Sequence, residues 1–114
     1  METLRFYAQA ADESDPARKV YSSSDNVAQA VIMFKREPGY TEEARRANIS
    51  GVVRLRAVLA SNGQVEHIIV IRGLPGGLTE KAIAAARQIR FTPATLNGRP
   101  VSQFILSEYN FNIY

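Results

Sequence analysis

The sequence predicts an α+β fold: a small antiparallel sheet of about three strands, made of a hairpin and a C-terminal strand, with two helices packed on one face. Two runs rich in β-branched residues flank an Asn-Gly pair, which indicates the hairpin. Two other stretches have the caps or the apolar spacing of helices, and the chain ends in a run of β-branched and aromatic residues.

The composition is that of one globular domain. The chain has 114 residues, of which 46% are hydrophobic and 22% charged, which suits a packed core and argues against wholesale disorder. Its longest uncharged apolar run, Ala30 to Phe34, is far too short to span a membrane, and no signal peptide is recognisable. The chain has no cysteine, which excludes disulfides and thiolate chemistry. We therefore expect either a cytoplasmic protein or a part of a longer chain.

Residues 1–28 show little periodicity, and we interpret them as a linker or the tail of a preceding region. Within them, Thr3 to Ala8 is compatible with a short strand, whereas the stretches around Pro16 and Ser22 to Asn26 read as polar connections. Ala30 to Lys35 is apolar and suits a strand or an extended packing arm.

A first helix is predicted after Pro38-Gly39, because this pair interrupts whatever precedes it. Thr41 is a suitable N-cap, since its hydroxyl can accept a hydrogen bond from a free amide of the first turn. Acidic residues follow where the helix dipole favours negative charge, and basic residues follow toward the other end; these are Glu42, Glu43, Arg45 and Arg46.

A hairpin is predicted between Gly51 and Arg72. Asn62-Gly63 favours a type I′ turn, because both residues accept a positive φ, and Ser61 then pairs with Gln64. This register places Leu59 opposite Glu66, Ala57 opposite Ile68, Leu55 opposite Val70 and Val53 opposite Arg72. The core face is expected to consist of Val53, Leu55, Ala57, Leu59, Ile68 and Val70. The other face is mixed, so either the N-terminal arm or a second subunit covers part of it, or β-branched residues simply fill strand positions.

A second helix is predicted from the apolar residues that recur at helical spacing, which are Leu78, Ala82, Ala85, Ala86 and Ile89. Thr79 is the expected N-cap, and Pro93 ends the helix by about Thr92. Asn97-Gly98 then marks a turn before the last strand. In that strand one face carries Ile105, Ser107, Tyr109, Phe111 and Ile113. Being last in the chain, it is a candidate for a sheet edge that accepts an incoming strand, unless residues 30–35 cover it or a homodimer pairs it.

Several of these stretches together resemble the TonB C-terminal domain family. The resemblance rests on Gly77 to Ala82, Arg87 to Ala94 and Asn97 to Val101, in this order and spacing, and on the Pro38-Gly39-Tyr40 segment with the helix start behind it. The hairpin also fits the family pattern. Thr41 stands where the family usually has a proline, and Ala57 where it has a bulkier side chain. The resemblance covers about residues 30–114, and we assign 29–114 to the TonB-like domain.

The resemblance implies a periplasmic domain of an energy transducer, anchored in the inner membrane by an N-terminal segment absent from this sequence. Such a domain couples to an ExbB/ExbD-type motor and docks on outer-membrane TonB-dependent transporters by β-strand addition, passing on proton-gradient energy. The partner-binding residues expected from this reading are Arg36, Glu37, Tyr40, Ile105, Ser107, Glu108, Tyr109, Asn110 and Phe111. Family members usually have Gln at the position of Glu37, so an amide contact there is not carried over.

Two other functions are kept as alternatives. A TonB-like domain can serve another envelope protein as a scaffold, and a net charge of +3, concentrated after residue 29, would suit a basic domain that binds nucleic acid. The arginines form no cluster with stacking aromatics, which argues against the second. No catalytic residues, metal site or cofactor are predicted: His67 has no ligand neighbours, and Gly73 to Gly77 lacks the spacing of a phosphate loop. The partner's identity and a strand-swapped dimer stay open.

Overall fold

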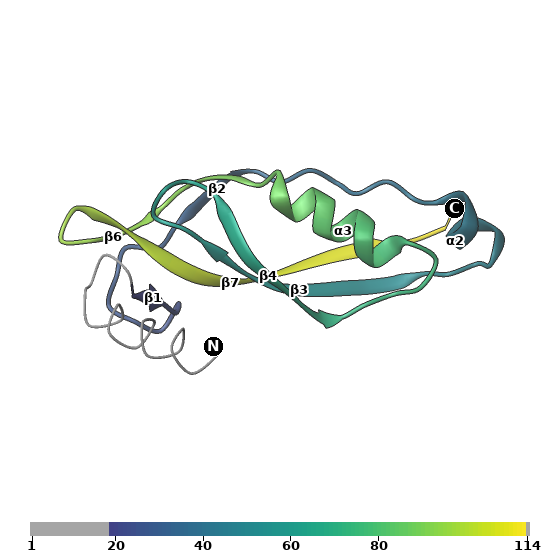
Figure 1. Ribbon diagram of the computed structural model, residues 1–114, viewed down its shortest axis with the longest axis horizontal. Helices are drawn as coiled ribbons and strands as arrows, with labels where there is room; N and C mark the ends of the chain where they lie inside the picture. Colours follow the sequence, from purple (N-terminus) through teal and green to yellow (C-terminus); the bar gives the residue numbers. More distant parts are fainter. Residues whose placement is uncertain (1–18, 114) are drawn as a thin grey trace, which may run out of the picture.

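The computed structural model describes residues 19–113 (Figure 1). In chain order its elements are β1 (Val20–Tyr21), β2 (Val31–Phe34), α2 (Glu42–Arg46), β3 (Gly51–Leu59), β4 (Val65–Arg72), α3 (Leu78–Arg87), β5 (Arg90–Thr92), β6 (Ala94–Leu96) and β7 (Arg99–Phe111). The predicted strand at Thr3 to Ala8 lies outside the described residues. None of the described helices is long and apolar enough to cross a membrane.

The fold is α+β as predicted, but the expectation of about three strands was wrong. The described strands form a five-stranded sheet, in the order β1-β7-β3-β4 with β6 also on β7, and a separate pair of β2 with β5. Three of the extra strands, β1, β5 and β6, are two or three residues long and leave too short a pattern in the sequence to be recognised. Strand β2 lies within Ala30 to Lys35, which was expected to be a strand or an extended arm. In this sheet β3 lies between β7 and β4, so the last strand of the chain pairs with the first strand of the hairpin.

Strand β7 is the axis of the molecule and runs along most of its length (Figure 1). It pairs antiparallel with β3, from Gly51 opposite Phe111 to Leu59 opposite Gln103. Its first residues pair with β6 through Asn97-Gly98, where φ is 53° and 79°. Two positive φ angles in a two-residue loop are the signature of a type I′ turn.

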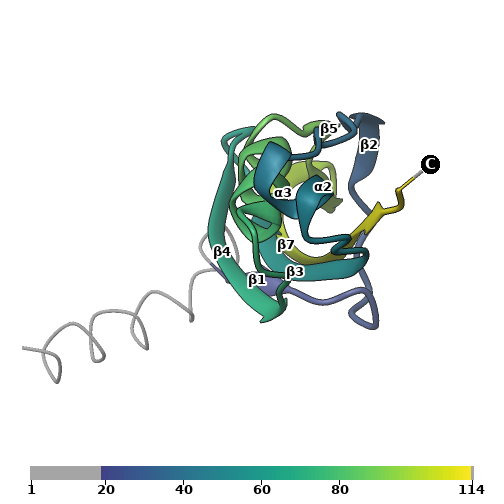
Figure 2. The same cartoon turned by 90° about the vertical axis from the view of Figure 1, so that its right-hand side faces the viewer.

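Both helices lie on the same face of the sheet, as predicted (Figure 2). Their buried side chains pack with the inward face of β3 and β7 in one cluster, whose largest fully buried members include Leu55, Leu59, Leu78, Tyr109 and Phe111. The predicted apolar residues of this helix are all buried, and the last of them, Ile89, lies just beyond the end of α3 at Arg87. Burial of this one stripe explains why the helix forms here.

Helix α2 is short but well terminated. The Thr41 hydroxyl accepts a hydrogen bond from the amide of Ala44 at 3.0 Å, which confirms the predicted N-cap. At the other end Asn48 adopts φ 56°, and the amide of Ile49 donates to the carbonyl of Ala44 at 2.9 Å. This is the Schellman arrangement, and it turns Ile49 back onto the core.

Helix α3 begins differently from the prediction, which named Thr79 as its N-cap. The N-cap is Gly77 in the left-handed conformation, with no side-chain hydrogen bond. Thr79 lies inside the first turn, where its hydroxyl bonds both the amide and the carbonyl of Leu74 at 2.8 Å. Positive φ angles at Gly76 and Gly77 let the chain enter the helix earlier than the threonine suggested.

The hairpin turn also differs from the predicted type I′ geometry. Leu59 pairs with Val65, the amide of Ala60 donates to Gln64, and within the loop 61–63 only Gly63 has a positive φ. The loop therefore has three residues, not two. The amide of Ser61 is bonded to the Ser102 hydroxyl of β7 at 3.0 Å, a tertiary contact that local sequence does not reveal.

The predicted hairpin register is right in the middle and wrong at both ends. Leu55 pairs with Val70 as expected, whereas Val58 faces Glu66 and Arg54 faces Arg72, so the other three predicted pairs are not formed. Irregularities between these pairs shift the register, and His67 there takes φ 53°. On β3 the predicted core residues are all buried; on β4 Ile68 packs on the core but Val70 is 43% exposed.

Part of the predicted linker contacts the folded domain. Strand β1 pairs parallel with Ser102 and Gln103 of β7, and Tyr21 is buried with Ala94 and Val101 in a second, smaller cluster. Ala28 forms a bridge with Thr95. The domain boundary at residue 28 stays a prediction, but residues 20, 21 and 28 pair with the sheet.

Candidate functional site: the outer edge of strand β7

Strand β7 has one edge covered by β3 and one edge that faces outward. In an antiparallel ladder both backbone groups of a residue point to the same side, and this side alternates along the strand. The carbonyl of Glu108 accepts a hydrogen bond from the Lys35 ammonium at 3.0 Å, so it points away from β3. The backbone groups of Phe104, Leu106 and Asn110 share this outward direction.

The outward edge is open over most of its length. Within residues 19–113, β1 is the one strand paired there, and it reaches only Ser102 and Gln103. From Phe104 onward no described strand pairs with the outward side. Unpaired backbone donors and acceptors on an edge can be completed by an added strand.

Side chains on β7 alternate as the sequence predicted. Gln103, Ser107, Tyr109 and Phe111 are buried on the core face with Ile105 partly buried among them, whereas Leu106, Glu108 and Asn110 are exposed. Leu106 is 65% exposed, the largest value for an apolar side chain of β7. The residues whose backbone faces outward are thus also those whose side chains point away from the core.

Residues 30–40, which we call the strap, run alongside β7 in the same direction. The amide of Ala30 donates to the side-chain oxygen of Gln103 at 2.9 Å, and Lys35 reaches Glu108. The ring of Tyr40 packs edge-on against Phe111 with centroids 5.7 Å apart, and its hydroxyl donates to the carbonyl of Ile49. Figure 2 shows β2 and the end of β7 on the same side of the molecule.

Two buried hydroxyls lie on β7 beneath the strap. Ser107 Oγ and Tyr109 OH have no hydrogen-bond partner of acceptable geometry among the described residues. Burial raises the pKa of Tyr109, because it disfavours the phenolate; the nearby Ser107 hydroxyl offsets part of this rise, and the negative charge of Glu37 adds to it. Tyr109 is therefore neutral at physiological pH.

The predicted partner-binding residues fall into two groups that the fold brings together. Arg36, Glu37 and Tyr40 lie on the strap, and the residues from Ile105 to Phe111 lie on β7 beside it. Ser107, Tyr109 and Phe111 face the core, so only a rearrangement would bring their side chains to a partner. Whether any of the nine binds a partner stays a prediction.

Sequence reasoning missed three residues of this edge. Phe104 and Leu106 carry outward backbone groups, and Lys35 contacts the edge directly. The alternation along β7 could have found the first two, once it was known which side faces β3. Nothing in the sequence places Lys35 beside Glu108, because the two are 73 residues apart.

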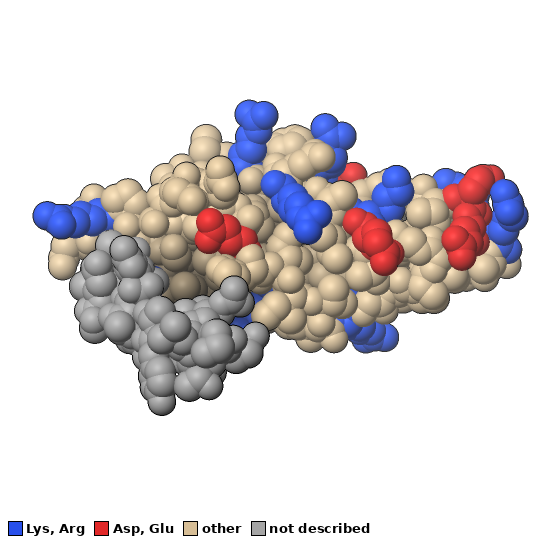
Figure 3. Space-filling view, in the orientation of Figure 1, with Lys and Arg blue, Asp and Glu red and all other residues tan. Residues whose placement is uncertain are grey.

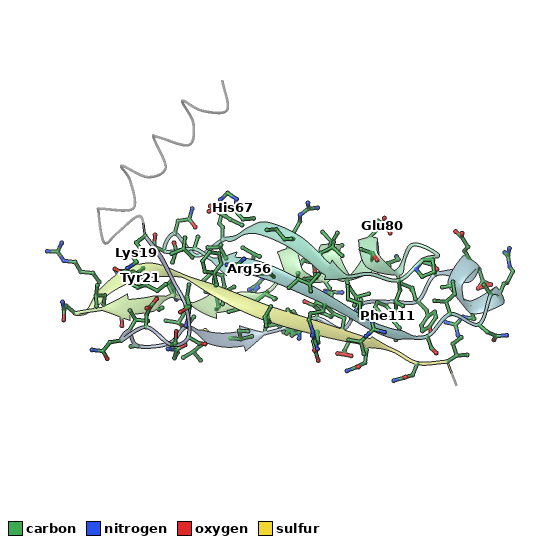
Figure 4. The ribbon with its side chains drawn as sticks, turned by 90° about the horizontal axis from the view of Figure 1, so that it is seen from below. Lys19, Tyr21, Arg56, His67, Glu80 and Phe111 are labelled. Carbon is green, nitrogen blue, oxygen red and sulfur yellow. The ribbon has the colours of Figure 1, made fainter. Side chains whose placement is uncertain are left out.

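The outer face of the sheet carries mixed charges. Arg54 forms an ion pair with Glu108, its Nε lying 2.7 Å from the carboxylate, and the guanidinium of Arg56 lies 4.0 Å from the centre of the Phe104 ring. Figure 3 shows basic and acidic groups interspersed along one side of the molecule. His67 points outward from a part of the sheet that is distant from Phe111 (Figure 4). Among the described residues, no group of His, Cys, Asp or Glu side chains could hold a metal ion.

The family model for the C-terminal domain of Gram-negative bacterial TonB proteins matches residues 36–113, more than half of the chain. The chain belongs to the TonB C-terminal domain family. This confirms the resemblance noted in the sequence. TonB C-terminal domains are periplasmic in Gram-negative bacteria, are interaction domains rather than enzymes, and interact with outer-membrane TonB-dependent transporters.

A solved structure has the same fold. The solution NMR structure of the Pseudomonas aeruginosa TonB C-terminal domain superimposes with a TM-score of 0.62 at 22% sequence identity, covering 81% of this chain and 92% of that one. At this identity the similarity concerns the fold. No curated protein matches the chain significantly.

Proposed function

We propose that this TonB C-terminal domain binds an extended segment of an outer-membrane TonB-dependent transporter as an additional strand on the outward edge of β7. The observation that carries the proposal is the row of outward backbone groups at Phe104, Leu106, Glu108 and Asn110, with which no strand among residues 19–113 pairs. Strand addition needs such a row, and β7 offers it next to the strap.

Backbone hydrogen bonds supply the grip in this mechanism. Each added bond contributes about 1 kcal/mol net, so several are required before the ordering of a flexible segment is offset. The open part of the edge begins where β1 ends at Gln103 and reaches the end of β7, which gives room for a short strand. Side chains of the strap and of Leu106 then contact the added segment and select among partners.

We further propose that the domain works as the periplasmic end of an energy transducer. A region outside this sequence would anchor it in the inner membrane and couple it to an ExbB/ExbD-type motor, so that force is transmitted through the docked strand. The family assignment supports this role over a scaffold or a nucleic-acid-binding domain. Interspersed charges on the face shown in Figure 3 agree with that preference.

The test uses two proline variants that differ in the direction of the lost amide. Leu106→Pro removes an outward donor, whereas Ser107→Pro removes a donor that faces β3 and should unfold the sheet. Leu106→Ala is the matched control that keeps the backbone. Binding is measured by capturing detergent-solubilised transporters from outer membranes of the source organism on immobilised domain, with folding checked by circular dichroism.

We expect Leu106→Pro to stay folded and lose transporter capture, while Leu106→Ala retains most of it. If a folded Leu106→Pro domain captures transporters as well as the parent does, docking uses another edge. Because the Leu106 side chain is exposed, its removal leaves the core packing intact, and circular dichroism checks that the proline leaves β7 paired with β3.

A further inference from the structure

The strap places one charged side chain directly on the outward edge of β7. The Lys35 ammonium lies 3.0 Å from the carbonyl oxygen of Glu108 and 4.5 Å from the centre of the Tyr109 ring. Both contacts favour a positive charge at this point. Lys35 therefore competes for an acceptor that a strand pairing with residue 108 would use.

The position of Lys35 follows from how the strap is anchored. The bond between Ala30 and Gln103 holds one end, and the contact of Tyr40 with Phe111 holds the other. Between these anchors the backbone of the strap makes no strand pairing with β7. The ammonium of Lys35 can nevertheless swing away, because it sits on a flexible four-carbon stem and is exposed.

Exposed apolar side chains surround this edge and favour its pairing with another chain. Leu106 is 65% exposed on the edge, and the four residues of β2, Val31 to Phe34, are all exposed beside it. A free edge flanked by exposed apolar side chains tends to pair with another chain. Natural sheets counter this tendency with charged residues on the edge, lysine in particular.

We propose that Lys35 is a displaceable guard of the β7 edge. Its ammonium hinders pairing of this edge with a second copy of the chain, and it leaves Glu108 when a partner strand docks. The displacement by a partner strand rests on the proposed function, whereas the hindrance of self-pairing does not. Losing one exposed, charge-assisted hydrogen bond corresponds to about a fivefold change in pairing for each edge, hence about 25-fold when two edges meet.

The test compares Lys35→Ala with Lys81→Ala in the full chain. Both variants remove one exposed positive charge, but Lys81 lies on α3 and does not touch the edge. Lys35→Met is a second variant that keeps an apolar stem over Tyr109 and removes only the ammonium. Sedimentation equilibrium measures the dimer dissociation constant of each, with folding checked by circular dichroism.

We expect the dissociation constant to fall about 25-fold in both Lys35 variants and to stay at the parental value in Lys81→Ala. Adding Leu106→Pro to Lys35→Ala should restore the parental value, because the edge amide is then blocked. The proposal would be refuted if loss of Lys35 left the dimer dissociation constant unchanged. It would also be refuted if the tighter dimer persisted after Leu106→Pro was added.

The transporter capture described above tests the displacement step separately. If Lys35 must leave Glu108 before a partner strand docks, Lys35→Ala should bind transporters about fivefold more tightly than the parent. Equal or weaker binding refutes displacement. If neither the parent nor any variant captures a transporter, the proposed function fails, and the sedimentation result alone decides whether Lys35 guards the edge.

Discussion

Gly76 is the position where the structure makes its sharpest quantitative prediction. It lies in the loop between β4 and α3, has φ +73°, and faces α2 at close range. A Cβ added there would lie 3.0 Å from the Ile49 side chain and 3.1 Å from both Cα and Cβ of Ala44. Ala44 is fully buried, so its backbone has little room to yield.

Two costs follow for Gly76→Ala. A left-handed conformation costs an alanine about 1 kcal/mol relative to glycine. Overpacking against a buried backbone costs about 1–3 kcal/mol more. Alanine also lowers the conformational entropy of the unfolded chain, which stabilises the folded state by about 0.5 kcal/mol. We therefore expect the free energy of unfolding to fall by about 1.5–3.5 kcal/mol.

Gly63→Ala is the matched control, because Gly63 also has a positive φ, +89°, but no atom within 4 Å of the added Cβ. The free energy of unfolding of Gly63→Ala should fall only by the conformational cost, about 1 kcal/mol or less. Urea denaturation followed by circular dichroism measures both variants. Equal losses at the two positions would show that Ala44 does not pack against Gly76 as closely as described.

Two further predictions concern Thr41 and Tyr109. Thr41→Val should lower the free energy of unfolding by about 1–2 kcal/mol relative to Thr41→Ser, because valine cannot cap the amide of Ala44 or donate to the carbonyl of Gly76; equal urea midpoints for the two would contradict this. Tyr109→Phe should be as stable as the parent or up to about 1 kcal/mol more stable at pH 8, since it removes an unpartnered buried hydroxyl. The raised pKa of Tyr109 means that its contribution is present below about pH 10, the pKa of an unfolded tyrosine, and is lost as the pH rises above it. Urea titrations at pH 8 and pH 11 should therefore show a smaller alkaline loss in Tyr109→Phe, and an identical loss in both proteins would refute the pKa shift.

The elements that the sequence predicted correctly depend on neighbours along the chain. The cap at Thr41 needs only an amide three residues away, and the buried stripe of α3 needs only helical spacing. The alternation from Ile105 to Phe111 likewise follows from the two-residue period of a strand. Such patterns persist whatever the rest of the molecule does, so they can be identified before the fold is known. The family assignment also started from short motifs of this kind.

Turn and register details were decided by contacts from elsewhere in the chain. The Asn62-Gly63 loop is one residue longer than its local sequence suggested, and the amide of Ser61 beside it is held by Ser102. His67, in the left-handed conformation, lies where the pairing between β3 and β4 shifts. Histidine adopts this conformation more readily than most residues, but nothing in the local sequence indicates that it does so here. Short strands such as β1 form because β7 offers them an edge, not because two residues have a strand pattern of their own.

The sequence by itself determined the two helices, the main strands, the core face of β3 and β7, and the family. Only the tertiary structure decided which edge of β7 faces outward and which side chains lie on it. Strand order places β3 on one side of β7, and on the other side no strand of the described residues pairs with Leu106 or Glu108. Lys35 reaches Glu108 across 73 residues of sequence because the strap is anchored at both ends. A contact of that separation is set by packing, and packing is not encoded in any local pattern.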